Sequence, residues 1–363
     1  MKPIALYLPQ YHEIKENSAW WGEGYTEWTA VKKATPLFKG HQQPRIPLND
    51  NYYDLADETG GTWKWQADLA NKFGVYGFCV YHYWFNGKQL LEKPLQILLK
   101  HSEIPINFCV CWANESWTKT WYGLEKEILM KQEYGQSKDW ESHFFYLLPF
   151  FKDNRYIKVD NKPLLCLYKS ADIHCLSEML DCWRKLAIEN GFPGLHIVSS
   201  NNAGPREERQ HLIDAYYDFQ PGCSYNSIST FYKLKYKLSI LAKSFCNFLS
   251  GSQNLERIPD IRYIYKAIES RLQVLARAVT AKPTYPGAFP MWDNTPRRNH
   301  KGYTYKNASP DFFRQLLKKT KDALPNAEFV FLNAWNEWGE GCYLEPDTIN
   351  RYEYLEAIRK NFS

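Results

Sequence analysis

Two carboxylates three residues apart, Glu337 and Glu340, stand in an aromatic and glycine-rich segment (335–341, Trp-Asn-Glu-Trp-Gly-Glu-Gly). The apolar run before them, 329–334, predicts a strand that ends there. Carboxyl groups among aromatic side chains are partly desolvated, which raises the pKa of one and lets it act as an acid near neutral pH. Glycosidic chemistry uses such a pair, one group protonating the departing oxygen and the other acting as base or nucleophile. We therefore predict that Glu337 and Glu340 are catalytic; the alternative is that they cap a turn.

Other strand-like segments also end in aromatic and polar side chains. In 112–117 (Trp-Ala-Asn-Glu-Ser-Trp), amide and carboxylate groups can bond adjacent ring hydroxyls, and indoles can stack on a sugar. The alternatives are turn capping and core filling. The predicted substrate contacts are Tyr7, Gln10, Trp21, Glu27, Trp28, His41, Tyr81, Tyr83, Trp84, Asn114, Glu115, Trp117, Trp292, Asp293, Arg297, Trp335, Asn336, Trp338 and Glu345.

A basic pair, Arg297 and Arg298, follows Trp292 and Asp293. Guanidinium groups bind phosphate oxygens through paired hydrogen bonds, so the pair could meet the phosphate of a nucleotide sugar or a lipid pyrophosphate. The alternative is a surface turn with solvated arginines.

Apolar runs rich in β-branched and aromatic residues alternate with helical patterns along the chain. This alternation predicts an α/β fold, a (β/α)8 TIM barrel with long β-α loops, because the polar and aromatic residues collect just after the strands, where barrels carry their sites. A doubly wound open sheet is the alternative. The loop that follows residue 12 is expected to run to about residue 60 without clear regular structure. The expected strands are 4–8, 77–83, 106–112, 163–168, 195–199, 215–219, 288–292 and 329–334, and the expected helices are 62–73, 93–101, 139–151, 174–190, 310–323 and 351–361.

One stretch, 231–281, stands apart from this alternation, and we predict an inserted amphipathic helical hairpin within a single domain, 1–363. Its first half interleaves lysines with leucines and phenylalanines. Residues 231–249 could lie on an anionic inner-membrane surface. The alternative is a helical excursion packed on the barrel with a solvated lysine face.

Bulk composition limits the possible functions. A net charge of +5 over 363 residues gives no signature of nucleic-acid binding, and we expect no nucleic-acid partner. The nine cysteines contain no Cys-x-x-Cys pair, so we expect reduced thiols, no metal and no cofactor. We find no export-signal pattern and no apolar stretch of membrane-spanning length. We therefore expect a cytoplasmic protein, either free or peripheral to the inner membrane.

Together these segments resemble the WbsX-type proteins, which are glycoside hydrolase family 99-like and are encoded among bacterial O-antigen and other surface-polysaccharide genes. The similarity rests on 7–12 (Tyr-Leu-Pro-Gln-Tyr-His), 20–28 (Trp-Trp-Gly-Glu-Gly-Tyr-Thr-Glu-Trp), 36–41 (Pro-Leu-Phe-Lys-Gly-His), 83–87 (Tyr-Trp-Phe-Asn-Gly), 111–117 (Cys-Trp-Ala-Asn-Glu-Ser-Trp), 292–298 (Trp-Asp-Asn-Thr-Pro-Arg-Arg) and 333–341 (Asn-Ala-Trp-Asn-Glu-Trp-Gly-Glu-Gly). It runs from residue 4 to about residue 358.

The resemblance implies a (β/α)8 barrel and metal-free, retaining chemistry. In family 99 proper, endo-α-mannosidases use two Glu residues of an Asn-Glu-Trp-x-Glu motif. One is a base on the sugar 2-hydroxyl, giving a 1,2-anhydro intermediate, and the other is the acid and then the base. Glu337 and Glu340 match these positions, whereas Gly339 stands where the hydrolases usually carry His.

The sequence is compatible with three functions. We favour a retaining enzyme, expected to be a glycosyltransferase, that makes or remodels glycosidic bonds in surface-polysaccharide assembly from a lipid-linked glycan or a nucleotide sugar. An endo-acting α-glycoside hydrolase is the first alternative. A catalytically inactive carbohydrate-binding barrel is the second.

Overall fold

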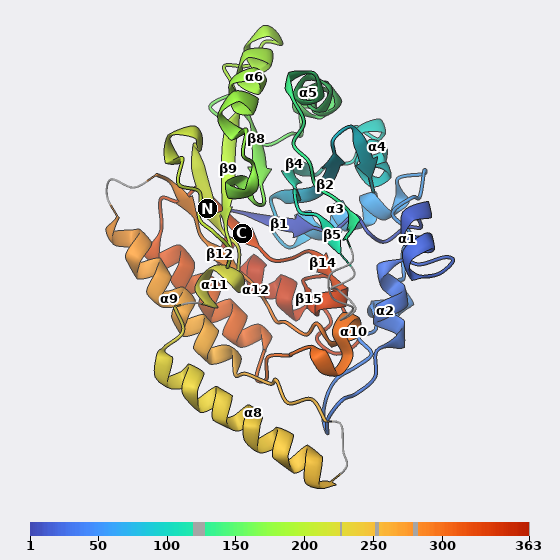
Figure 1. Ribbon diagram of the computed structural model, residues 1–363, viewed down its shortest axis with the longest axis vertical. Helices are drawn as coiled ribbons and strands as arrows, with labels where there is room; N and C mark the ends of the chain where they lie inside the picture. Colours follow the sequence, from blue (N-terminus) through green and yellow to red (C-terminus); the bar gives the residue numbers. More distant parts are fainter. Residues whose placement is uncertain (119–127, 226, 251–253, 279–281, 363) are drawn as a thin grey trace.

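The protein is built around a parallel sheet that is nearly closed into a barrel (Figure 1). The computed structural model describes residues 1–118, 128–225, 227–250, 254–278 and 282–362. The sheet has the strand order β11-β10-β9-β8-β4-β2-β1-β13-β12, and every neighbouring pair along this path is parallel. Its strands are β1 (Lys2–Tyr7), β2 (Gly77–Phe85), β4 (Asn107–Trp112), β8 (Lys162–Leu167), β9 (His196–Asn201), β10 (Ala215–Asp218), β11 (Thr284–Tyr285), β12 (Gly287–Ala288) and β13 (Phe329–Leu332).

The seventh strand position closes the barrel, and it differs from the sequence prediction. β11 pairs with β10 and β12 pairs with β13, with Pro286, which has no N–H to donate, between them. A Cβ at Gly287 would lie 1.7 Å from the Asp218 carbonyl oxygen, so glycine allows the two strands to approach. The predicted strand 288–292 is therefore wrong by four residues at its start, because the apolar run continues beyond the paired backbone into the site loop.

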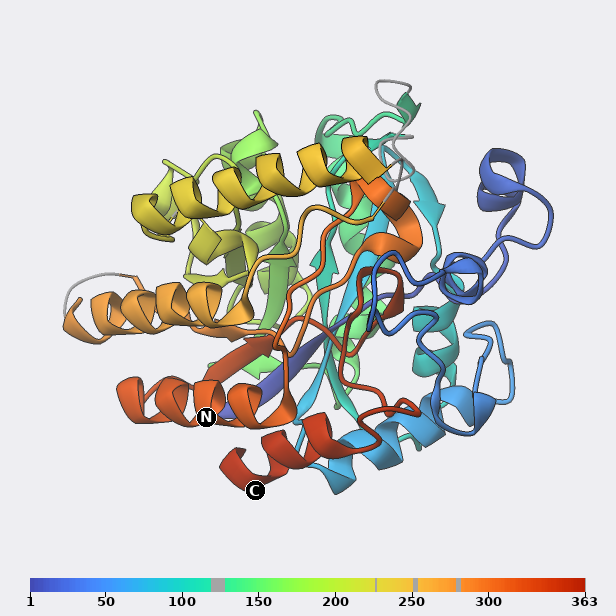
Figure 2. The same cartoon turned by 90° about the horizontal axis from the view of Figure 1, so that it is seen from below.

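Helices cover the outside of the barrel (Figures 1 and 2), which confirms the predicted (β/α)8 architecture. α11 packs against both α12 and α9, and α5 packs against α6. The larger helices are α3 (Gly61–Lys72), α4 (Lys93–Lys100), α5 (Ser137–Lys152), α6 (Leu176–Glu189), α8 (Thr230–Ser250), α9 (Ile261–Arg277), α11 (Pro310–Ala323) and α12 (Glu353–Phe362).

Smaller elements shape the loops. The expected unstructured segment before residue 60 contains two helices, α1 (Lys15–Trp21) and α2 (Glu27–Lys33), so that prediction is wrong. Each is only seven residues long, too short for helical periodicity to reveal it. The remaining elements are α7 (Gly222–Tyr225), α10 (Thr295–Arg298), β3 (Lys88–Leu90), β5 (Trp117–Thr118), β6 (Ile128–Met130), β7 (Lys158–Val159), β14 (Asn336–Glu337), β15 (Cys342–Tyr343) and 3-10 turns at Leu48–Asp50, Ser170–Asp172, Gln210–Leu212, Asn299–Lys301 and Trp338–Glu340.

The stretch 231–281 contains two helices that differ in burial. α9 presents an apolar face, including Ile264 and Ile268, to the core, whereas α8 has no buried side chain. The two contact one another through Tyr232 and Tyr263, whose rings stack at 3.5 Å. Within the described residues, no helix has both the length and the apolar character needed to cross a membrane.

Candidate active site

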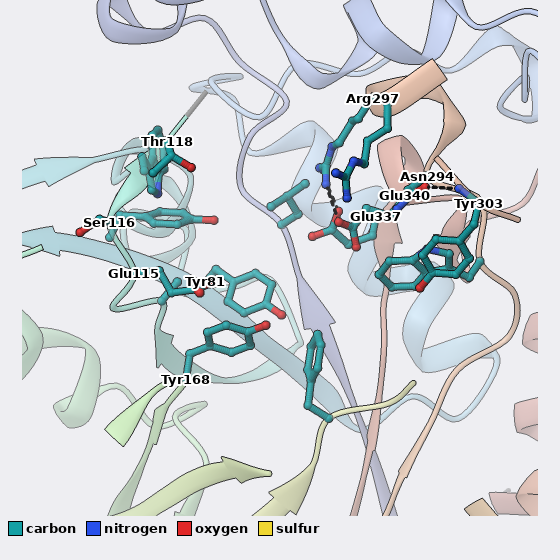
Figure 3. A pocket seen from close by; sticks show the side chains of 17 residues that line it. Tyr81, Glu115, Ser116, Thr118, Tyr168, Asn294, Arg297, Tyr303, Glu337 and Glu340 are labelled. Atoms are coloured by element: carbon teal, nitrogen blue, oxygen red, sulfur yellow. Dashed lines mark hydrogen bonds and ion pairs between the residues drawn. The ribbon is translucent and has the colours of Figure 1, made fainter. Parts of the chain in front are cut away.

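The site is a cavity of about 570 Å³ at the carboxyl ends of the barrel strands (Figure 3). Its walls come from the last part of β2 and from the segments that follow β1, β4, β8, β10, β12 and β13. The cavity is lined by Leu8, Tyr81, Tyr83, Ala113, Glu115, Ser116, Trp117, Thr118, Tyr168, Phe219, Trp292, Asn294, Arg297, Arg298, Tyr303, Glu337 and Glu340.

Arg297 joins three carboxylates at one side of the cavity. Its Nη2 lies 3.0 Å from Glu337 Oε2 and its Nη1 lies 3.0 Å from Glu340 Oε1. Its Nε donates to Glu27 Oε2, also at 3.0 Å. The four groups come from α2, α10 and the turn after β13, so closure of the barrel brings together residues separated by up to 313 positions, from 27 to 340.

The electrostatics of this cluster suit acid and base chemistry. Burial raises the pKa of Glu337 to about 8, against the opposing effect of Arg297. Burial also raises the pKa of Glu340, again opposed by Arg297. The nearby Arg298 also lowers the pKa of Glu340, but burial outweighs both arginines, so Glu337 and Glu340 titrate as a pair that retains a proton near neutral pH. The pair thus holds both a proton donor and a proton acceptor, which glycosyl transfer or hydrolysis requires.

Gly339, between the two catalytic candidates, faces Arg297 and Glu27. A Cβ at this position would lie 2.6 Å from Arg297 Nε and 2.6 Å from Glu27 Oε2. The Arg297–Glu27 ion pair therefore occupies the space into which any side chain at residue 339 would project. This accounts physically for the glycine where the family 99 resemblance would place a histidine.

A hydrogen-bonded loop holds Arg297 in place. Asp293 Oδ2 lies 2.7 Å from His41 Nε2, and Asp293 Oδ1 accepts hydrogen bonds from the backbone N–H and hydroxyl of Thr295. The Asp293 N–H donates to the Glu340 carbonyl oxygen at 2.7 Å. Asp293 therefore ties the start of α10, which carries Arg297, to the turn that carries Glu340.

Another buried carboxylate, Glu345, lies behind the turn that carries the catalytic candidates. It accepts hydrogen bonds from Trp338 Nε1 at 2.7 Å, Gln66 Nε2 at 2.8 Å and the Tyr53 hydroxyl at 3.0 Å. Burial raises its pKa to about 7.

Asn336 bonds both the N–H and the carbonyl oxygen of Leu8, which ties the turn to the end of β1.

The opposite wall of the cavity is aromatic and hydroxylated. Figure 3 shows Tyr81 and Tyr168 facing Glu337 across the space. Glu115 stands on the same side, with Lys169 Nζ 2.5 Å from its Oε1. On the side of the carboxylates, Tyr303 lies beside Glu340 in Figure 3 and stacks on Trp292 with the ring centroids 6.0 Å apart. A sugar ring could therefore meet aromatic faces, hydroxyl groups and carboxylates at once.

The structure divides the sequence-predicted contacts into three groups. The first lines the cavity and consists of Tyr81, Tyr83, Glu115, Trp117, Trp292 and Arg297, together with the catalytic candidates Glu337 and Glu340. The second, Gln10, Trp21 and Glu27, lines a smaller adjoining hollow that shares Trp117. The third lies outside both hollows and supports their walls: Tyr7, Trp28, His41, Trp84, Asn114, Asp293, Trp335, Asn336, Trp338 and Glu345.

Direct substrate contact by this third group stays a prediction, and in the structure two of its members pack against other aromatic side chains. Trp335 packs against Phe78 inside the barrel, and Trp84 stacks on His143 at 4.5 Å. Alternation along a strand turns half of its side chains away from any one space, so an aromatic at a strand end need not face the ligand.

The sequence prediction also missed cavity residues. Tyr168 and Phe219 directly follow β8 and β10, so the strand-end argument could have found them. Tyr303 lies beyond α10, and its place against Trp292 depends on the tertiary fold. The other cavity residues not predicted as contacts are Leu8, Ala113, Ser116, Thr118 and Asn294.

Three thiols meet away from the cavity, inside the barrel. Cys79, Cys109 and Cys166, on the neighbouring strands β2, β4 and β8, are fully buried, and their sulfur atoms lie within 4.8 Å of one another. This spacing would allow a metal ion geometrically. Small buried thiols also fill a barrel interior as apolar groups. All nine cysteines are free.

The parallel barrel and its acidic, aromatic cavity define the class of (β/α)8 carbohydrate-active enzymes. The profile of the family described as "Glycosyltransferase WbsX" matches residues 3–358, and the chain belongs to this family. It is also 36% identical over 365 residues to "Uncharacterized protein WxcX" from Xanthomonas campestris pv. campestris (strain ATCC 33913), covering 98% of this chain and 49% of that protein. The chain thus spans about half the length of the curated relatives it matches.

Solved structures share the fold. The GH99 endo-alpha-mannosidase from Bacteroides thetaiotaomicron superposes with a TM-score of 0.60 at 12% identity, covering 99% of this chain and 95% of that chain. A structure titled "Glycoside hydrolase-like protein" gives a TM-score of 0.62 at 12% identity, covering 100% and 94%. The chain is therefore a WbsX-type protein with a family 99-like barrel.

Proposed function

We propose that this protein is a retaining glycosyl-transfer enzyme of bacterial surface-polysaccharide assembly, of the O-antigen type, acting in the cytoplasm. The observation that carries the proposal is the pair of catalytic candidates, Glu337 and Glu340, held 3.0 Å from the same arginine in an aromatic cavity. The substrate is a glycan, and its activated form is a lipid-linked glycan or a nucleotide sugar.

The proposed chemistry follows the route that the family 99 resemblance implies. The Glu337–Glu340 pair shares one proton near neutral pH, and the reaction starts from the form in which Glu340 holds it. Glu337 then takes the proton of the sugar 2-hydroxyl while O2 bonds to C1, and the bond from C1 to the leaving oxygen breaks. Glu340 gives its proton to that oxygen. An acceptor hydroxyl then attacks C1 and loses its proton to Glu340, while the C1–O2 bond breaks and O2 regains its proton from Glu337. Two displacements at C1 leave its configuration unchanged.

Arg298 supplies the proposed contact to an activated donor. The two arginines predicted to meet phosphate both line the cavity, but only Arg297 forms ion pairs with Glu27, Glu337 and Glu340. Arg298 Nε is buried and has no hydrogen-bond partner among the described residues. A phosphate oxygen of the donor would satisfy it.

The test incubates the purified protein with lipid-linked glycan, with and without candidate nucleotide sugars. A product that grows only with donor supports transfer; shortened glycan without donor indicates an endo-acting α-glycoside hydrolase in its place. Binding without any product indicates a non-catalytic carbohydrate-binding barrel.

Site variants test the residue assignment in the same assay. We expect Glu337→Gln and Glu340→Gln each to lower the rate at least about 100-fold, as loss of acid or base catalysis does. Glu103→Gln, at an exposed carboxylate outside the cavity, is the matched control. Near-full activity in both site variants would refute the assignment.

A further inference from the structure

The apolar face of α8 points away from the protein. The side chains Phe231, Leu234, Leu238, Leu241, Phe245, Phe248 and Leu249 are each 57–82% exposed. They follow the spacing i, i+3, i+7, i+10, i+14, i+17 and i+18, which places them on one side of the helix. We call these seven residues the α8 stripe. A helix that packs on a core normally turns such a stripe inward, so this one is oriented for a partner.

The opposite side of α8 contacts α9 and the segment that joins the two helices. Its partly buried residues include Tyr232, Tyr236 and Asn247. The Tyr232 hydroxyl accepts a hydrogen bond from the Asp260 N–H at 3.0 Å, and Asn247 Nδ2 donates to the Asn254 carbonyl oxygen at 2.8 Å. The helix is thus anchored by aromatic and polar groups, which leaves the α8 stripe free.

The charges of α8 select the kind of partner. Between residues 230 and 250 there are four lysines and no Asp or Glu. At 100° per residue, Lys235 and Lys237, both exposed, lie on the two borders of the α8 stripe. In a pairing of two copies, lysines would border the seam without acidic partners on either helix, which disfavours a dimer. An apolar stripe bordered by lysines matches the acyl boundary and the negative headgroups of an anionic membrane.

We propose that α8 docks this protein onto an anionic lipid surface and lies in the plane of the bilayer interface. In the chain, α8 comes after β10 and Phe219, and Phe219 lines the cavity. In Figure 2, α8 (yellow) lies at the same end of the molecule as α10 (orange), the helix that carries Arg297. Docking therefore brings the mouth of the cavity toward the lipid. The docking stands on the geometry of α8; the lipid-linked glycan it would present rests on the proposed function.

Vesicle co-sedimentation of the full chain tests the docking. We expect binding to vesicles of equal parts phosphatidylcholine and phosphatidylglycerol in about 0.1 M KCl, weak binding in about 1 M KCl, and little binding to phosphatidylcholine alone. The triple variant Leu238→Gln, Leu241→Gln, Phe245→Gln should lose at least about 100-fold in partitioning. The double variant Lys235→Gln, Lys237→Gln should lose about 30-fold, equivalent to about 1 kcal/mol per lysine.

Two controls separate the possible outcomes. Ile188→Gln, at an exposed apolar residue of α6, should partition to vesicles like the wild type. Glu337→Gln should also partition like the wild type, because vesicle binding does not depend on catalysis. The proposal is overturned if the triple variant partitions unchanged or if anionic and neutral vesicles bind equally. It is also overturned if the wild type ignores vesicles and instead forms a dimer that the triple variant dissociates, as measured by light scattering.

Discussion

Substituting Gly339 by alanine probes how tightly the cluster of Glu27, Arg297 and the catalytic candidates Glu337 and Glu340 is packed. The new Cβ would lie 2.6 Å from both Arg297 Nε and Glu27 Oε2, whereas such contacts are normally about 3.5 Å or longer. The ion pair must therefore move by about 1 Å. Arg297 now lies 3.0 Å from Glu337 and from Glu340, and a 1 Å movement would take both contacts beyond hydrogen-bond range.

We expect two measurable consequences. Overpacking should lower the free energy of unfolding by about 1–3 kcal/mol in urea titrations. Displacing the groups that position the catalytic pair by about 1 Å should lower the rate on the order of 100-fold. Gly222→Ala is the control, because its Cβ would meet its nearest neighbour, Ala203 N, at 3.5 Å. If Gly339→Ala keeps wild-type stability and rate, the ion pair does not fill this space in solution and our account of the glycine fails.

Three further predictions concern the same cluster. Arg297→Met leaves the three carboxyl groups without the cation that bonds them, and we expect the free energy of unfolding at pH 8 to fall by about 3–5 kcal/mol. This loss should shrink toward pH 5, because the carboxylates become protonated. Equal losses at pH 8 and pH 5 in urea titrations would contradict the prediction. The pKa of Glu337 rises on folding from 4.5 to about 8, so the folded state binds the extra proton and the wild type loses stability as the pH rises between these values. Glu337→Gln should therefore be more stable than the wild type by roughly 2–4 kcal/mol at pH 8 and by little at pH 5, and thermal unfolding that shows a constant difference would speak against it. Asp293→Ala frees the loop that carries Arg297, so kcat should fall more than KM rises; a change in KM alone would mean that Asp293 acts on binding.

The sequence predicted the barrel because its strands are buried on both faces and therefore appear as apolar runs. The same rule misplaced the seventh strand, since the apolar residues continue past Ala288 into the loop before Asp293. Strand pairing depends on backbone hydrogen bonds, which an apolar run does not reveal. The signal in the sequence is the pair Pro286, which has no N–H, and Gly287, which has no Cβ.

The part of the site that could be predicted is the part whose functional residues lie close together in the sequence. Glu337 and Glu340 lie three residues apart, so their proximity is visible in the sequence. Glu27 was predicted as a substrate contact, yet its contact to Arg297 spans 270 positions and exists only because the barrel closes. Likewise, whether Trp292 or Trp335 faces the cavity depends on local backbone direction, which residue type does not reveal.

The space beside Gly339 also constrains how this family can have diversified. A side chain at residue 339 and the Arg297–Glu27 pair in its present position compete for the same volume. A histidine at 339 would therefore require the Arg297–Glu27 pair to move or to be replaced. We therefore expect positions 27, 297 and 339 to change together among related sequences, so that the residue at 339 reports which of two arrangements a given relative uses.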